Sequence, residues 1–106
     1  MYVRLSVNRL VPEHRDEYLR ILKEEAASAN TDEPRCRNYH VLLGDSDDDL
    51  LVIYEVFEDR EAFQEHVDSP HYEKFTLKVK AFEGPITERV LKLEAKSLVP
   101  DDETWR

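Results

Sequence analysis

The period of the hydrophobic pattern changes several times along this chain, and the order of those changes restricts the folds open to it. Apolar residues alternate with polar ones from Val3 to Val11, which predicts a half-buried strand. Between Glu13 and about Ala29 they recur every three or four positions, which predicts an amphipathic helix. Alternation returns from about Cys36 to Leu43, and Leu50 to Phe57 is the most apolar run of the chain; these two segments predict a hairpin.

The remainder of the chain adds further helical segments and a last strand. Asp59 is a side chain that commonly caps a helix N-terminus, and it predicts a short helix that Ser69-Pro70 ends. A further helix is expected from His71 to about Phe82, where Gly84-Pro85 stops it, and a strand from Ile86 to about Lys96. The predicted order is β-α-β-β-α-β, an α+β fold of the ferredoxin-like class with helices on one face of an antiparallel sheet.

Apolar residues occupy both faces of the predicted third strand. Leu51 and Ile53 point one way, whereas Leu50 and Val52 point the other. Because the helices cover only one face of the sheet, the other face needs a second cover. The simplest cover is a second copy packed sheet against sheet, so we predict a homodimer.

Composition excludes several classes of protein. The 106 residues suit one domain, expected over residues 1–99, followed by a polar tail over 100–106. With 24 acidic and 15 basic residues the net charge is −9, which argues against nucleic-acid binding. The single cysteine, Cys36, excludes an internal disulfide. There is neither a bilayer-spanning apolar run nor a signal-peptide pattern, so we expect a cytoplasmic protein without a membrane partner.

Four short motifs carry a resemblance to a known family. In chain order they are Glu33-Pro34-x-Cys36 before Tyr39, Tyr54-Glu55-x-Phe57, Ala62-Phe63-x-x-His66 and Ser69-Pro70-His71-Tyr72. Their order and spacing resemble the antibiotic biosynthesis monooxygenase (ABM) family of dimeric α+β barrel proteins, and the element order fits the whole chain. The Gly84-Pro85 turn and the strand after it are most similar to the family member that processes phosphorylated autoinducer-2.

Some positions depart from the family pattern. Arg35 stands where the family usually has glycine, which bears on the geometry of that turn. Phe57 stands where quinol-oxidising and haem-degrading relatives often carry tryptophan. Asn8 resembles an asparagine that faces the substrate in haem-degrading relatives, but Thr76 stands where those relatives have their histidine iron ligand. Haem degradation is therefore the less favoured function.

The resemblance implies a pocket between sheet and helices that takes a small, often aromatic or polyketone-like molecule. Several relatives oxygenate phenols or quinols without flavin, metal or haem: the enzyme deprotonates the substrate, and the anion reduces O2. We therefore expect a cofactor-independent monooxygenase that uses a small organic substrate and O2. The alternatives are an isomerase of a phosphorylated diketone and a ligand-binding dimer without catalysis.

Three residues are the candidate catalytic set. His66 is the expected base or hydrogen-bond partner, since an imidazole titrates near ~6.5; the alternative is a histidine packed under its helix and tied to a backbone carbonyl. Tyr72 either points its hydroxyl into the pocket or buries its ring. Asn8 completes the set through the resemblance.

The expected substrate-binding residues include a carboxylate on an apolar strand. Glu55 is expected to form an ion pair with an arginine such as Arg9 or Arg89, the alternative being that it orients His66. His40 is expected on the pocket side because Asn38 shares its face. The remaining candidates are His71, as a helix cap or turn residue, and the rings of Phe57, Phe63 and Phe75.

The histidine spacing argues against a metal site. His66 and His71 are five positions apart across a proline, whereas a helical zinc pair has them four apart. The chain also has no cysteine pair. We therefore expect neither a metal nor another cofactor.

Overall fold

The computed structural model describes residues 1–97, and the statements below concern that part of the chain. The expected tail over 100–106 lies outside the described residues. The elements are β1 (Tyr2–Leu10), the 3-10 helix η1 (Pro12–His14), α1 (Arg15–Asp32), β2 (Cys36–Gly44), β3 (Asp47–Phe57), α2 (Arg60–Val67), α3 (Pro70–Lys80) and β4 (Thr87–Lys96).

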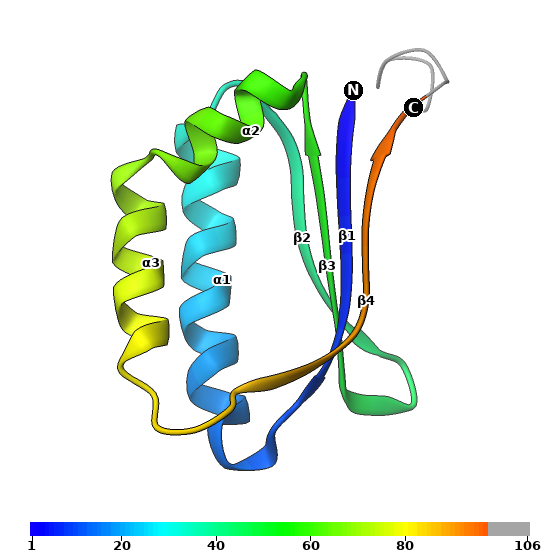
Figure 1. The fold of residues 1–106 in the computed structure, drawn as a ribbon, viewed down its shortest axis with the longest axis vertical. Helices are drawn as coiled ribbons and strands as arrows, with labels where there is room; N and C mark the ends of the chain where they lie inside the picture. The colour runs from blue at the N-terminus through cyan, green and yellow to red at the C-terminus, as the bar shows by residue number, and fades with distance from the viewer. Residues whose placement is uncertain (98–106) are drawn as a thin grey trace.

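One antiparallel sheet holds the strands in the order β2-β3-β1-β4. In the register of the central strand β1, Arg4 lies between Glu55 of β3 and Glu94 of β4. Figure 1 shows α1 and α3 side by side over one face of the sheet, with α2 at the end where β1 begins and β4 ends. The predicted ferredoxin-like α+β fold is confirmed, because the helices all lie on that one face.

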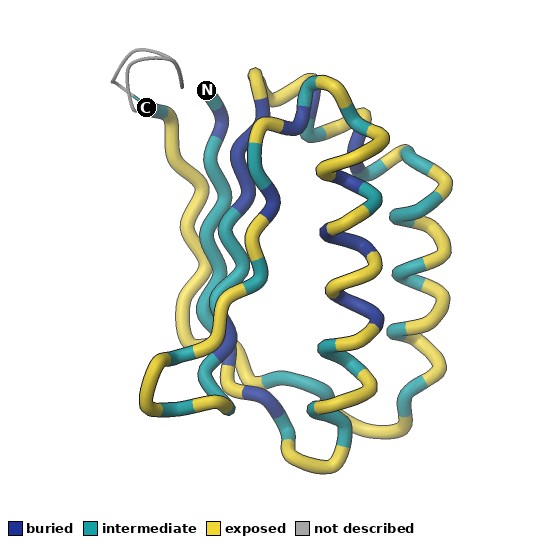
Figure 2. Tube along the Cα trace, turned by 180° about the vertical axis from the view of Figure 1, so that it is seen from behind, coloured by how far each residue is buried: buried dark blue, intermediate teal, exposed yellow. Residues whose placement is uncertain are grey.

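The core lies between α1 and the helix-facing side of the sheet. Leu22 and Ala29 of α1 are buried against this side, where Leu51 and Phe57 of β3 are also buried. Figure 2 shows the buried positions of α1 turned toward the sheet and the exposed ones turned away. Each large apolar side chain that is fully buried here stabilises the fold by about 1.5–3 kcal/mol.

The opposite face of the sheet is apolar and has no helix over it among residues 1–97. Leu51 of β3 is buried, whereas Val52 points to this open face and is only half-buried, as the two-sided strand pattern predicts. Leu42, Leu91 and Leu93 on the neighbouring strands are 46%, 48% and 49% exposed. We call this surface the open sheet face.

α1 continues three residues beyond the expected end at Ala29. The helical hydrogen bonds persist, since the Glu33 amide donates to the Ala29 carbonyl at 3.3 Å. Asn30 side-chain atoms also exchange two hydrogen bonds of 3.0 Å with the Tyr39 backbone. These contacts fix the helix end against β2, so the segment expected to be a polar turn begins later.

The hairpin turn is shorter than the expected Gly44 to Asp49. Gly44 pairs with Asp47, and a Cβ on Gly44 would lie 2.7 Å from the Asp47 carbonyl oxygen, so this close approach requires glycine. The aspartates that follow extend β3 because arginines neutralise them: Arg9 pairs with Asp47 at 3.0 Å and Arg15 with Asp49 at 3.3 Å. Positive charges from β1 and α1 thus offset the weak strand preference of aspartate.

Arg35 fits its turn without the conformational freedom of glycine. No residue other than glycine in the described chain has a positive φ, so Arg35 has an ordinary backbone. Its guanidinium pairs with Glu58, Asp59 and Glu65 at 2.7–3.0 Å, which links the start of β2 to α2. None of the helices in residues 1–97 is long and apolar enough to cross a membrane.

Candidate functional site

The break between α2 and α3 brings two histidines together. His66 lies in the last turn of α2, and the Ser69 hydroxyl donates to its carbonyl at 2.7 Å. The same hydroxyl accepts from the Tyr72 amide at 3.3 Å and so caps α3, in which Pro70 is well suited to the first position. The imidazole centroids of His66 and His71 are consequently 5.6 Å apart.

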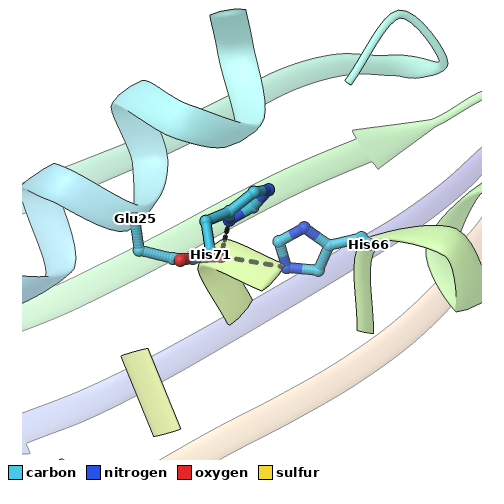
Figure 3. A group of neighbouring side chains, drawn as sticks. All are labelled: Glu25, His66 and His71. Atoms are coloured by element: carbon cyan, nitrogen blue, oxygen red, sulfur yellow. Dashed lines mark hydrogen bonds and ion pairs between the residues drawn. The ribbon is translucent and has the colours of Figure 1, made fainter. Parts of the chain in front are cut away.

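Two glutamates from α1 and the turn after it meet these imidazoles. His66 Nδ1 donates to Glu33 Oε2 at 2.7 Å, and His71 Nδ1 donates to Glu25 Oε1 at 2.9 Å. The other two nitrogens also face carboxylates, His66 Nε2 at 3.7 Å from Glu25 Oε1 and His71 Nε2 at 2.6 Å from Glu33 Oε2. Figure 3 shows the Glu25 carboxylate reaching toward both rings. We call Glu25, Glu33, His66 and His71 the histidine–glutamate cluster.

Burial and charge oppose each other in this cluster. Burial lowers the pKa of His71, but the hydrogen bond to Glu25 and the charges of Glu25 and Glu33 outweigh burial, so the pKa is raised above its usual value. The imidazolium form of His71 then compensates carboxylate charge that has left water. The cluster therefore favours the protonated form of His71 and links three helical segments.

His66 is part of the protein interior rather than the wall of an open pocket. Its side chain is 1% exposed, and both of its nitrogens face carboxylates. The ring edge of His66 meets Tyr72 with centroids 5.1 Å apart. The alternative given for His66, packing beneath its helix, describes this position, although the partner is a carboxylate rather than a backbone carbonyl.

A second polar group lies on the helix-facing side of the sheet. Arg4 Nη1 is 3.9 Å from Glu55 Oε2, and Arg4 Nε is 3.6 Å from Glu94 Oε1. The Arg4 guanidinium lies 4.3 Å from the centroid of the Phe63 ring. Among the described residues, the buried Arg4 Nε has no hydrogen-bond partner. This Nε–H is buried beside the Glu94 carboxylate, beyond hydrogen-bond distance.

Glu55 is the most perturbed carboxyl group on this side of the sheet. It is 8% exposed, and burial raises its pKa to about 7, with the Arg4 guanidinium acting in the opposite direction. The expected ion pair is present, but the expectation of Arg9 or Arg89 as partner is wrong. Arg4 is the partner because the β1–β3 register sets it directly opposite Glu55.

Asn8 also lies on the helix-facing side, further along β1. It is buried, and its Nδ2 donates to Ser6 Oγ at 3.3 Å. Four residues of strand separate Asn8 from Arg4, which corresponds to about 13 Å. Asn8 and Glu55 are therefore at different ends of this surface.

The expectation that His40 faces the helices is wrong. Tyr39 is buried, with its ring centroid 5.6 Å from that of His66, whereas His40 is exposed and lies beside Tyr54 on the open sheet face. A register shift between Cys36 and Asn38 leaves both Cys36 and Tyr39 on the inner side. The position of polar Asn38 on the same face of β2 as His40 was therefore not evidence that this face lines a pocket.

The three candidate phenylalanines contribute to packing around the cluster. Phe57 is fully buried, and its ring lies 5.4 Å from the rings of both Phe63 and His66. Phe75 packs between Tyr18 and Tyr72, with centroid distances of 6.5 and 6.3 Å. These rings keep water away from one side of the cluster.

Sequence reasoning missed Glu25 and Glu33. The signal for Glu25 is its position: it follows Leu22 by three and precedes Ala29 by four, so it falls in the buried stripe of α1. A carboxylate in such a stripe requires a partner. Glu33 belongs to the Glu33-Pro34-x-Cys36 motif, but the motif does not indicate which residue the Glu33 side chain contacts.

The structure also corrects the spacing argument against a metal. The ligand atoms of Glu25, His66 and His71 all lie within 4.8 Å of one another. The i, i+4 rule describes two histidines on one helix, whereas these come from two helices that meet at a break. The chain thus assembles a set of metal-ligand residue types that spacing within one helix cannot reveal.

Comparisons with solved structures find the same fold in bacterial proteins. A candidate antibiotic biosynthesis monooxygenase from Bacteroides thetaiotaomicron matches with a TM-score of 0.79 and 25% identity, over 93% of this chain and 90% of that one. A protein from Mycobacterium tuberculosis matches with a TM-score of 0.75 and 21% identity, over 93% and 96%. One from Pseudomonas aeruginosa has a TM-score of 0.76 and 19% identity, over 92% and 94%.

None of the curated proteins matches this sequence. The model of the family called antibiotic biosynthesis monooxygenase matches residues 1–76, which include β1, α1, the hairpin and the residues of the histidine–glutamate cluster. With the motifs, the sheet order and the solved structures in agreement, the chain belongs to the antibiotic biosynthesis monooxygenase family.

Proposed function

We propose that this protein is a cofactor-independent monooxygenase that deprotonates a small phenol-, quinol- or polyketone-like molecule. One observation supports this most directly: the buried Glu55 carboxyl has a pKa of about 7 and lies beside Arg4. Near neutral pH a substantial fraction of such a group is ionised and still basic enough to accept a substrate proton. Arg4 beside it stabilises the anion that forms.

The chemistry needs no external reductant. Glu55 removes a proton from a CH2 group that lies between two carbonyl or aryl groups, and Arg4 Nε–H donates to the resulting enolate oxygen. The carbanion adds O2 to give a peroxide anion, which takes the proton back from Glu55. The resulting hydroperoxide loses water and leaves a ketone. The CH2 carbon is oxidised and O2 is reduced, with one oxygen atom in the product and the other in water.

In this proposal the histidine–glutamate cluster acts through positioning and not through contact with substrate. Its four side chains hold α2 and α3 against the end of α1, and Tyr72 and Phe63 are fixed against His66. Phe63 in turn supports the Arg4 guanidinium. Tyr72 is the further residue that we assign to the substrate side, and Asn8 is assigned to the far end of that surface, about 13 Å along β1 from Arg4.

We also propose that the active form is a homodimer joined through the open sheet face. The half-exposed leucines of β2 and β4 support this, because isolated subunits rarely expose contiguous apolar surfaces. A twofold axis would place the same surface of each copy in contact.

Oxygen uptake tests the proposal. Metal-free and flavin-free protein is mixed with a panel of quinols, dihydroxyphenols and anthrone-like molecules in an oxygen electrode cell. Uptake should rise with enzyme concentration and fall by about 100-fold or more in Glu55→Gln. Glu94→Gln, which changes the other carboxylate near Arg4, should retain most of the rate. Equal rates in wild type and Glu55→Gln would remove Glu55 from the mechanism.

The same protein samples separate the alternatives. The resemblance to the autoinducer-2 phosphate-processing type predicts isomerisation of a phosphorylated diketone, and Arg4 and Lys92 near Glu55 supply positive charge for a phosphate. Product formation from that substrate without oxygen uptake would favour the isomerase. Saturable binding without any product would favour the ligand-binding dimer.

A further inference from the structure

The histidine–glutamate cluster directs electron pairs toward one point. His66 Nδ1 donates to Glu33, so in the neutral ring Nε2 carries a lone pair. That lone pair faces Glu25 Oε1 at 3.7 Å, which is too long for a hydrogen bond. Two electron-pair donors that face each other in a buried site favour positive charge beside them, which in the present arrangement comes from the proton of His71 Nδ1 on the same Glu25 oxygen.

The second histidine completes the arrangement. His71 Nδ1 lies 2.9 Å from the same Glu25 oxygen, and its Nε2 lies 2.6 Å from Glu33 Oε2 without hydrogen-bond geometry in the present ring orientation. If an ion replaces the proton on Nδ1, the neutral ring carries its proton on Nε2, which faces Glu33. Glu33 would then accept from both histidines, as carboxylates behind metal-bound imidazoles commonly do.

We propose that Glu25 Oε1, His66 Nε2 and His71 Nδ1 bind one divalent transition-metal ion, with Glu33 as the outer partner of both imidazoles. Bonds of about 2.0–2.2 Å place neighbouring ligand atoms roughly 3.0–3.5 Å apart, and the present separations are within 4.8 Å. Two imidazoles and one carboxylate favour Zn2+, Fe2+ or Co2+ over Mg2+ and Ca2+, which prefer oxygen ligands.

An entry path and the local charge support this site. A cleft of about 80 Å³ between α1 and α3 is lined by Glu25 and His71, together with Ser28 and Lys74. Among residues 1–97, Glu25 has ion pairs only with the two histidines, so no lysine or arginine fills the cation position. Lys78, at the same cleft, is bound to Glu24 at 3.1 Å.

The ion would join α1, α2 and α3 at the point where they meet. Its site uses none of the atoms of Glu55 or Arg4, so it stands independently of the proposed function. Metal binding would release the proton from His71 Nδ1 and would stabilise the folded protein, because the three ligands come together only in the folded chain.

The test uses untagged protein freed of metal with a chelator and then dialysed at pH 7.5. Zn2+ is titrated by calorimetry, and Co2+ by its visible absorption, which reports nitrogen and oxygen ligands directly. We expect one ion per chain, and a higher Tm with Zn2+ than without. Glu33→Gln should weaken binding by about 10–100-fold.

Ligand variants and matched controls decide the assignment. His71→Ala and Glu25→Gln should weaken Zn2+ binding by more than about 100-fold, with folding checked by circular dichroism. His40→Ala and Glu24→Gln remove the same residue types outside the cluster and should bind as wild type does.

Two results would overturn the site. One is the absence of saturable Zn2+ and Co2+ binding by the folded wild type. The other is binding at a different place, shown by unchanged affinity in folded His71→Ala or by loss of binding in Asp48→Asn in the acidic hairpin. Neither depends on oxygen uptake, so this proposal and the proposed function fail separately.

Discussion

Glu55 lies in the interior of the protein, and its neighbours compensate only in part for the loss of water. Burial is the largest influence on its pKa and raises it, Arg4 and Lys92 lower it, and the carboxylates of Glu25 and Glu33 raise it further. The result, about 7, leaves a group that changes charge near neutral pH. A single residue therefore links the stability of the fold to the proposed chemistry.

The stability of this protein should depend on pH through Glu55. In the unfolded chain the group titrates near 4.5, so between that pH and about 7 the folded protein binds the additional proton. The contribution of Glu55 to the free energy of unfolding of the wild type therefore falls as pH rises through that window. Relative to wild type, Glu55→Gln should gain on the order of 3 kcal/mol in the free energy of unfolding between pH 4.5 and 8.

Urea denaturation of both proteins across this pH range measures the difference. Groups other than Glu55 titrate in both proteins and largely cancel. A difference in unfolding free energy that stays constant with pH would show that Glu55 titrates normally.

At the scale of elements, the junction of α2 and α3 determines where the histidines lie. Ser69 connects the two helices through one hydroxyl, which bonds the His66 carbonyl and the Tyr72 amide. Arg35 binds acidic groups at the start and on the surface of α2, and so fixes that helix to the sheet. The Ser69 and Arg35 contacts thus fix the position of α2 and of its junction with α3. The histidine–glutamate cluster, whose residues come from distant parts of the chain, forms at that junction.

Replacing the capping hydroxyl should cost stability. Ser69→Ala leaves the Tyr72 amide without its acceptor, and the expected loss is about 1 kcal/mol of unfolding free energy. Ser46→Ala, in the exposed hairpin turn, is the control and should stay within about 0.5 kcal/mol of wild type. Chemical denaturation measures both. Equal stability of the two variants would mean that the cap contributes nothing.

At the scale of the whole molecule, the open sheet face is apolar and has no cover among residues 1–97, which suggests a partner surface. β4 is exposed along nearly its whole length, and its leucines continue the apolar surface formed by β1 and β3. A net charge of −9 keeps separate molecules apart in general, so association requires a specific surface. The open sheet face is that surface in our proposal.

A charged residue introduced into the open sheet face should separate the subunits of the proposed dimer. Light scattering at micromolar concentration should give twice 12.5 kDa for wild type and 12.5 kDa for Leu93→Glu. Leu77→Glu on α3, where the leucine is also exposed, should remain dimeric. The dimer proposal fails if wild type is a 12.5 kDa particle.

The candidate site divides into a part that sequence could predict and a part that it could not. His66, His71 and Tyr72 were predictable as a group, because short motifs and a proline break mark them within seven positions. Their partners were not, since Glu33 is 33 positions from His66 and Glu25 is 46 from His71. No local pattern states which distant carboxylate meets an imidazole.

The order of strands and helices along the chain, the two apolar faces of β3, the cap at Asp59 and the helix break at Ser69-Pro70 could all be predicted from the sequence alone. These features depend on residues a few positions apart, whose periodicity and hydrogen bonding are local. Only the tertiary structure decided that Tyr39 rather than His40 faces inward and that Arg4 pairs with Glu55. Register and helix packing decide these contacts, because they minimise buried, uncompensated charge over the whole molecule rather than within one segment.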